Sequence, residues 1–399
     1  MAYREISVDE LRFGMYVAEL DRPWTDTPFM FQGFVLRTEK QLESLKKYCK
    51  KVYVDPEKID RKLDEEAKAR AAAAVRGTTE YKELASVEAE LPRAEKAFQR
   101  STVVVTEIGR TVQMKGAIDT ERTQQASTQI TESVVRNPDA ITLLAKMQEK
   151  GGGTLSRAVE VSVMMTVFGR FLQYSHEQLE TLSMLGMLQD VGKLRLPAVL
   201  LKKTTPFMPQ EQELYKVHVN YSVEILSKTA GLPPDFPGLA SLHHERYDGS
   251  GYPRGLRGNS ISLLGSIAGL VDAFDMLVAP PPWGENMSPS AALGVLFRQR
   301  HEKFPPGLVE QFIQCMGAFP VGSIVEMQTG EIGVVMSQNL VRRLQPRVML
   351  VQDAKGNLIN PHLVLDLMRE PKANADEPYR IRRTLDSSTV TIDPRELFL

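Results

Sequence analysis

Cysteine, net charge and long apolar runs are scarce in this sequence. Its two cysteines, Cys49 and Cys315, lie far apart, so no disulfide framework is expected and both thiols are interpreted as reduced and buried. Lysine and arginine number 49 against 50 acidic residues, a formal net charge of -1, which excludes broad binding to nucleic-acid polymers or anionic membranes. No run of about 18 apolar residues occurs and the first residues are polar, so we expect a cytoplasmic protein without a membrane span.

The overall composition is that of a globular protein with several compact units. Hydrophobic residues make up 42% of the chain and charged residues 25%, which excludes global disorder. A chain of 399 residues exceeds the usual reach of one hydrophobic core, so two or three units are expected. No repeat of the solenoid type is present.

Changes in sequence pattern divide the chain into four predicted parts, and the fold class is mainly α. Residues 1–56 combine short β-rich runs with one helical stretch, which indicates a small α+β module. Residues 57–137 are rich in Ala, Glu, Lys, Arg and Gln and predict a helical connector. Residues 138–316 form a succession of helical patterns, and residues 317–399 predict a small antiparallel β-barrel.

The helical connector admits two interpretations. It is either a solvated spacer, with or without coiled-coil character, or a helix that dimerises and transmits a signal. The second interpretation makes a homodimer a reasonable expectation.

Histidines and aspartates in the helical region raise a metal hypothesis. His218, His243 and His244 all lie close to loop-forming sequence, and Asp190 ends an apolar helix. Asp272 follows on a later apolar helix, where an isolated buried carboxylate is strongly disfavoured and a cation would compensate its charge. Taken one at a time, however, each aspartate is better explained as a helix cap or a solvated group, and each histidine as a packed or surface side chain.

The eleven residues 243–253, His-His-Glu-Arg-Tyr-Asp-Gly-Ser-Gly-Tyr-Pro, resemble the hallmark of the HD-GYP family position for position. Asp190-Val-Gly-Lys193 resembles the second half of the His-Asp-x-Gly-Lys signature of that family. Three N-terminal stretches, 11–17, 20–24 and 48–55, look like the uncharacterised domain that often precedes HD-GYP. The resemblance therefore covers nearly the whole chain and implies an HD-domain helical core.

The resemblance implies a bacterial signalling protein with a metal centre. Active relatives use two or three metals, commonly iron or manganese, to hydrolyse cyclic di-GMP, chemistry that suits clustered imidazole and carboxylate ligands. By position, one metal site comprises Asp190, His218, His243 and His244, and Asp190 also bridges to a neighbouring metal held by Asp272. Lys193 matches the lysine that contacts phosphate, and Tyr252 is the tyrosine of the family name.

This sequence departs from the family pattern at several ligand positions. Gln189 and Arg157 stand where the second metal usually has histidines, and Gly153 replaces the glutamate that holds a third metal. A carboxamide is a poor ligand and a guanidinium has no lone pair to offer, so Arg157 adds a positive charge that still attracts phosphate. The phosphate-gripping arginine expected beyond the Asp272 helix is also missing, since residues 280–284 read Pro-Pro-Pro-Trp-Gly.

Two functions from different classes follow, besides a purely structural scaffold. The first is a regulator with one divalent metal ion that binds cyclic di-GMP or a partner and has weak or no activity. The second is a working metal-dependent cyclic di-GMP phosphodiesterase with an unorthodox site. The loop Gly251-Tyr252-Pro253 is intact, and in the family this loop also docks GGDEF-domain cyclases.

Overall fold

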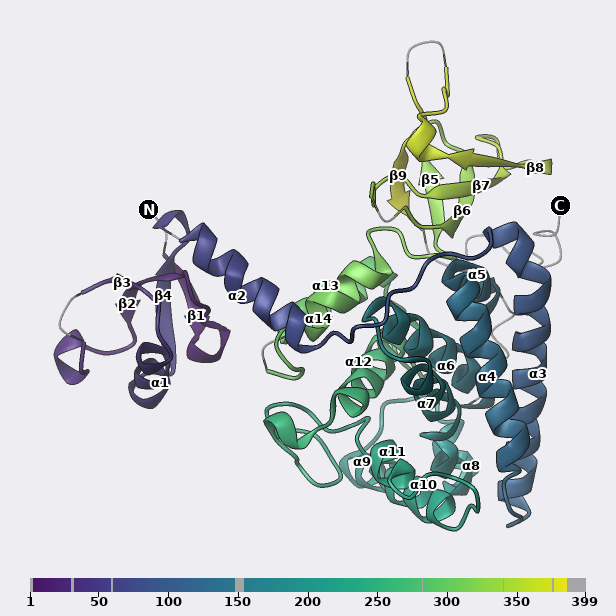
Figure 1. Ribbon diagram of the computed structural model, residues 1–399, viewed down its shortest axis with the longest axis horizontal. Helices are drawn as coiled ribbons and strands as arrows, with labels where there is room; N and C mark the ends of the chain where they lie inside the picture. Colours follow the sequence, from purple (N-terminus) through teal and green to yellow (C-terminus); the bar gives the residue numbers. More distant parts are fainter. Residues whose placement is uncertain are drawn as a thin grey trace.

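The computed structural model confirms a mainly α protein with a small sheet module at each end (Figure 1). It describes residues 3–29, 32–58, 60–147, 154–281, 283–300, 302–339, 341–374 and 377–385. Within these ranges no helix is both long and apolar enough to cross a membrane. The two cysteines are unpaired, and whereas Cys49 is buried, Cys315 is only partly so.

The N-terminal module is a four-stranded antiparallel sheet with one helix. Its strands are β1 (Arg4–Ser7), β2 (Tyr16–Leu20), β3 (Phe34–Val35) and β4 (Lys51–Asp55), in the order β1-β4-β2-β3. Helix α1 (Glu39–Tyr48) begins at a capping box made by Thr38 and Gln41. Alternating strand residues and Leu45 form a hydrophobic core of their own, separate from the larger core of the protein.

The predicted connector divides into one exposed helix and two helices that belong to the main core. Helix α2 (Arg61–Ala74) buries no residue and leads away from the N-terminal module (Figure 1). Helices α3 (Val87–Gln113) and α4 (Thr120–Arg136) instead bury an apolar stripe in the largest hydrophobic cluster. A solvated spacer is therefore the wrong description of these two helices, because their buried residues recur at helical spacing.

The remaining helices surround the residues expected to carry chemistry. The predicted helices over 157–172 and 176–188 are found as α6 (Thr154–Phe171) and α7 (His176–Leu188). Gly186 lies so close to the backbone of Ser162 that a side chain there would collide, so the two helices pack tightly. The other helices are α5 (Pro138–Met147), α8 (Ala198–Leu201), α9 (Pro209–Lys216), α10 (His218–Ser227), α11 (Phe236–Ala240), α12 (Leu263–Val278), α13 (Pro289–Gln299) and α14 (Leu308–Met316).

The C-terminal β-rich domain is a five-stranded antiparallel sheet. Its strands are β5 (Ile324–Met327), β6 (Ile332–Ser337), β7 (Arg347–Gln352), β8 (Leu358–Asp366) and β9 (Ile381–Thr384). They pair in the order β8-β7-β6-β5-β9, so β8 and β9 are its edges within the described chain. The sheet lies on the α5 side of the helical core (Figure 1), far from the histidine-bearing helices.

Candidate metal centre

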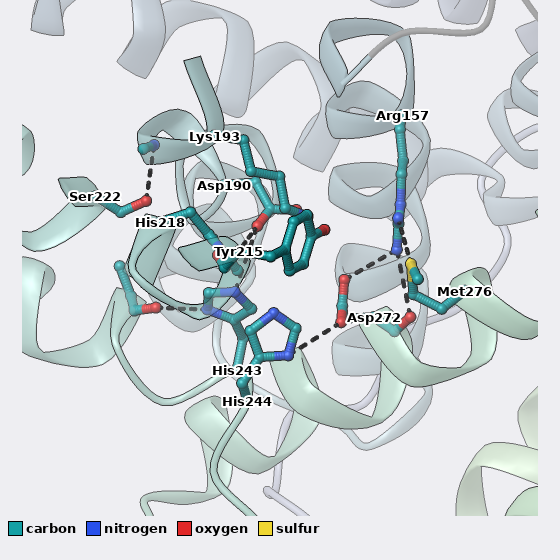
Figure 2. Close-up of polar contacts among 12 residues, drawn as sticks. Arg157, Asp190, Lys193, Tyr215, His218, Ser222, His243, His244, Asp272 and Met276 are labelled. Atoms are coloured by element: carbon teal, nitrogen blue, oxygen red, sulfur yellow. Dashed lines mark hydrogen bonds and ion pairs between the residues drawn. The ribbon is translucent and has the colours of Figure 1, made fainter. Parts of the chain in front are cut away.

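Four side chains from separate segments converge inside the helical core (Figure 2). Asp190 follows the end of α7, His218 is the first residue of α10, and His243 and His244 lie in the turn after α11. One ligand atom of each residue lies within 4.8 Å of the others. This group is the four-residue cluster, and it is the arrangement that the family resemblance implies.

Glycine makes the convergence of the first two segments possible. Gly192 packs so closely on α10 that an added Cβ would collide with the carbonyl oxygen of His218 and the backbone nitrogen of Ser222. The Gly192 N–H donates to the Ser222 hydroxyl at 2.9 Å. The Asp-x-Gly-Lys sequence therefore fixes the distance between the Asp190 carboxylate and the His218 ring.

Backbone carbonyls orient two of the imidazoles. His218 Nδ1 lies 2.6 Å from the Tyr215 carbonyl oxygen, and His243 Nδ1 lies 2.7 Å from that of Ala240. Because a carbonyl only accepts, each Nδ1 carries the proton and each Nε2 keeps its lone pair. Both Nε2 atoms lie 3.4 Å from Oδ1 of Asp190. An imidazole oriented by a hydrogen bond at its other nitrogen is the usual form of a histidine metal ligand.

The atoms that face one another in the cluster lack hydrogen-bond partners within the described chain. These atoms are Oδ1 of Asp190 and Nε2 of His218, His243 and His244. Leaving a buried polar group unpaired costs about 1–3 kcal/mol. Four such atoms around one point would be costly without an occupant, and imidazole nitrogens with a carboxylate oxygen suit a divalent transition metal. The residues present therefore fit a cation.

The electrostatics of the cluster also favour cation binding. Burial lowers the pKa of His218, and burial together with the neighbouring imidazoles holds the pKa of His244 well below its usual value. Burial works to raise the pKa of Asp190, but the Lys193 ammonium outweighs it and holds that pKa well below its usual value. Neutral rings and an ionised carboxylate are the states that metal binding needs.

Lys193 forms an ion pair with the second oxygen of the Asp190 carboxylate. Its Nζ lies 2.6 Å from Oδ2 of Asp190, and only 5% of its side chain is exposed. Burial works to lower the lysine pKa, but the Asp190 charge outweighs this and raises it, so the ammonium stays charged. A buried positive charge therefore stands beside the cluster, as expected for a phosphate contact.

Arg157 pairs with two buried carboxylates on α12. Its guanidinium is 3.0 Å from Oδ1 of Asp272 (Figure 2). It also lies 2.5 Å from Oδ2 of Asp275. Burial works to lower the pKa of Arg157, but the two carboxylates outweigh it and raise that pKa. Asp272 is thus neutralised by Arg157 and does not join the four-residue cluster, although its Oδ2 lies 3.6 Å from Nδ1 of His244.

The other positions that depart from the family pattern lie in different surroundings. Gln189 is 1% exposed, and its amide oxygen and nitrogen both lack a partner within the described residues. Trp283 lies partly exposed beyond α12, and its ring centroid is 5.6 Å from that of Phe207. Gly153 lies outside the described residues.

The Gly-Tyr-Pro loop packs directly on the cluster. The Tyr252 ring stacks on the His244 ring, with centroids 4.6 Å apart and planes at 24°. A Cβ on Gly251 would collide with the backbone of residues 244–246, so only glycine allows this approach. Glu245 is 4% exposed and accepts the N–H groups of Arg254 and Leu256 at 2.8 and 2.9 Å. The motif therefore ties the loop to the histidines that precede it.

Sequence reasoning missed Tyr215 and gave Asp275 no role in the site. Tyr215 lies three residues before His218, and its ring centroid is 5.0 Å from the His218 ring and 5.6 Å from the Lys193 Nζ. Asp275 lies three residues after Asp272 on α12, the helical spacing that places both carboxylates on one face. That spacing is a signal that could have assigned Asp275 to the site.

Comparison with known proteins identifies both large parts of the chain. Residues 140–308 match the HD domain family, and residues 3–123 match a domain of unknown function, DUF3391. A cyclic di-GMP phosphodiesterase of Pseudomonas aeruginosa is 29% identical over 372 residues, covering 92% of this chain and 89% of the relative. A cyclic di-GMP phosphodiesterase response regulator of Xanthomonas campestris is 33% identical over 181 residues, 45% of this chain and 48% of the relative.

A third relative and one solved structure also match parts of the chain. A 3'3'-cGAMP-specific phosphodiesterase of Vibrio cholerae is 35% identical over 128 residues, which are 32% of this chain and 24% of the relative. An HDG"Y"P protein from Bdellovibrio bacteriovorus aligns with a TM-score of 0.48 and 15% identity, over 78% of this chain and 98% of that chain.

Fold, site and family match together define the class: this chain is an HD-domain protein. In the motif of residues 243–253 and in the DUF3391 domain ahead of it, the chain resembles proteins of the HD-GYP type. The DUF3391 match extends to residue 123 and so crosses the predicted domain boundary at residue 56. The sequence pattern places that boundary at the end of the small sheet, whereas the family unit also includes α2 and α3.

Proposed function

We propose that this protein binds cyclic di-GMP at the four-residue cluster and holds one divalent metal ion there, iron or manganese. The observation that carries the proposal is the set of four buried, unpartnered ligand atoms within 4.8 Å of one another. The named activity of the relatives supports cyclic di-GMP as the ligand. A metal bound here would polarise a phosphoryl oxygen and lower the pKa of a coordinated water.

The same proposal assigns roles to the surrounding residues. Lys193 contacts the phosphodiester from one side of the cluster, and Arg157, which is paired with Asp272, stands on the other side (Figure 2). Tyr252 contacts the ligand from the loop side, where it already covers His244. A guanidinium matches phosphate geometry, but it cannot acidify water as a metal does.

Hydrolysis is accordingly weak or lost. Two-metal catalysis stabilises both the attacking and the leaving oxygen, and here Arg157 pairs with the carboxylates that a second metal would need. Losing one metal removes several kcal/mol of transition-state stabilisation, which corresponds to orders of magnitude in rate. The protein then acts as a signalling protein that responds to the nucleotide, and the exposed part of the Gly-Tyr-Pro loop offers a docking place for a GGDEF-domain cyclase.

A complete cluster with Lys193 beside it favours one alternative, an active cyclic di-GMP phosphodiesterase with a single metal. Purified protein supplied with iron or manganese separates the two. Isothermal calorimetry with cyclic di-GMP should show saturable binding, and chromatography after prolonged incubation should show little linear dinucleotide or GMP. Turnover comparable to that of an intact two-metal relative would establish the enzyme, and no binding at all would refute the proposal.

A further inference from the structure

Three aromatic rings lead outward from the four-residue cluster. Tyr215, on α9, lies beside His218 with ring centroids 5.0 Å apart. Phe207, in the loop before α9, lies 5.3 Å from Tyr215, and Trp283, beyond α12, lies 5.6 Å from Phe207. We call Phe207, Tyr215 and Trp283 the aromatic row. It joins two segments that are far apart in the sequence and starts at a proposed metal ligand.

The aromatic row is not part of the hydrophobic core. All three rings are partly exposed, whereas the large side chains of the core, such as Phe168 and Phe274, are almost fully buried. None of the three belongs to a core cluster or packs against one, among the clusters found in the described residues. The innermost ring, Tyr215, instead lies beside a charge, since the Lys193 Nζ lies 5.6 Å from the centre of that ring.

Trp283 also stands in the stretch where the family resemblance led us to expect a phosphate-gripping arginine. The proposed phosphate contacts that remain, Lys193 and Arg157, lie beside the cluster. An aromatic surface beside them is suited to the other half of a nucleotide, because every base has a π-face that stacks on aromatic side chains. In a nucleotide the base is attached to the phosphate through one sugar, so the two contacts fall on adjacent parts of one ligand.

We propose that the aromatic row is the stacking surface for a purine base of the cyclic dinucleotide whose phosphate lies at the four-residue cluster. This inference rests on the proposed function and names base-binding residues for it. Stacking of one base on an aromatic side chain contributes about 1–3 kcal/mol by alanine substitution. Removing one ring of the row should therefore weaken nucleotide binding about tenfold, because 1.4 kcal/mol corresponds to a factor of ten.

The two tryptophans of the chain allow a direct optical test. Trp24 lies in the N-terminal module against Phe29 and Phe34, so the full-length Trp24→Phe variant keeps an aromatic ring there and leaves Trp283 as the sole tryptophan. In this variant, loaded with manganese before the titration, cyclic di-GMP should change the Trp283 fluorescence saturably. The midpoint should agree with the dissociation constant from calorimetry on the same sample.

Substitutions provide the second arm of the test. Trp283→Ala and Phe207→Ala should each weaken cyclic di-GMP binding about tenfold without changing metal content, and Trp283→Phe should recover part of the loss. Phe297→Ala is the matched control, since this exposed ring packs against Arg300 away from the row. The aromatic row would be overturned if cyclic di-GMP binds by calorimetry, yet leaves the Trp283 fluorescence of the Trp24→Phe variant unchanged and binds both alanine variants with wild-type affinity. The proposed function would then still stand. Absence of binding in the wild type would overturn both.

Discussion

At the residue scale, the Asp190 carboxylate is divided between two kinds of partner. Oδ2 is neutralised by Lys193, while Oδ1 faces the His218 and His243 rings at equal distances of 3.4 Å. This division leaves one oxygen for a cation and keeps the carboxylate ionised in a buried place. The sequence alone could suggest these residues through the family motif, but it could not show which oxygen faces which group.

Replacing one imidazole of the cluster should abolish metal binding. We expect His243→Ala to reduce the bound metal from about one ion per chain to near zero, because the remaining ligands no longer enclose the site. Elemental analysis after dialysis against a weak chelator measures this. His176→Ala is the control, since that histidine is half exposed at the start of α7. Equal metal loss in both variants, or retention in both, would contradict the assignment.

The direction of Arg157 was beyond sequence reasoning because it depends on how α6 packs against α12. A guanidinium at that position could equally have faced solvent. The structure instead directs it at Asp272 and Asp275, with Nη1 2.7 Å from the sulfur of Met276. That Arg157 takes the place of a second metal ion stays a prediction, because it concerns metal occupancy. Its contacts with Asp272 and Asp275 support this prediction.

At the element scale, close backbone contacts position the cluster. Gly192→Ala should push the turn after α7 away from α10, because the new methyl group meets backbone atoms of His218 and Ser222. Overpacking of this kind costs about 1–3 kcal/mol. We expect lower stability in chemical unfolding together with reduced metal affinity.

Gly238→Ala is the matched control for this prediction. Gly238 lies in α11 with nothing near the position of an added Cβ, and alanine has the higher helix propensity. This variant should be as stable as the wild type or slightly more stable, with unchanged metal affinity. Equal behaviour of the two variants would show that the contact with α10 does not position Asp190.

Glu245 links the Gly-Tyr-Pro loop to the paired histidines. Its carboxylate accepts two backbone N–H groups, and such charge-assisted bonds contribute about 1.5–3 kcal/mol each. In Glu245→Ala, hydrogen exchange at the amides of Arg254 and Leu256 should accelerate markedly, while amides in α3 should stay protected. Unchanged exchange at both loop amides would mean that other contacts hold the loop.

At the scale of the whole molecule, the HD core extends backwards into the region expected to be a connector. The sequence predicted helices there correctly, but a helix rich in charged residues and alanine can be a spacer or a layer of a domain. Tertiary packing decides between them, and here Leu91 on α3 and Ile130 on α4 lie in the largest core. The composition predicted the helices, but it could not show what their apolar stripes pack against.

This packing predicts which substitutions in α3 and α4 matter. Ile130 is fully buried, so Ile130→Ala should lower the free energy of unfolding by about 2–5 kcal/mol. Val103 on α3 is 52% exposed, and Val103→Ala should change it by less than about 0.5 kcal/mol. Denaturant unfolding measures both, and a solvated connector would give equally small effects.

The junction between the helical core and the β-rich domain should depend on pH. Asp139 on α5 is partly buried and accepts the Gln338 N–H at 3.0 Å, and burial raises the Asp139 pKa to about 7. This pKa lies above the value of about 4 in the unfolded chain, so the folded state favours the protonated Asp139. The stabilising contribution of Asp139 is therefore complete below about pH 4 and is lost as the pH rises through 7. Relative to wild type, Asp139→Asn should gain about 1–2 kcal/mol between pH 5 and 8, because the partly exposed carboxylate keeps some of its water. A stability difference independent of pH would contradict this.

The number of metal ions per chain tests the central claim most directly. After loading with iron or manganese without oxygen and removal of loosely bound ions, elemental analysis should give about one ion per wild-type chain. The double variant Gln189→His with Arg157→His should give about two, because it restores both missing imidazoles beside Asp190 and Asp272. Two firmly bound ions in the wild type, or none, would contradict the account.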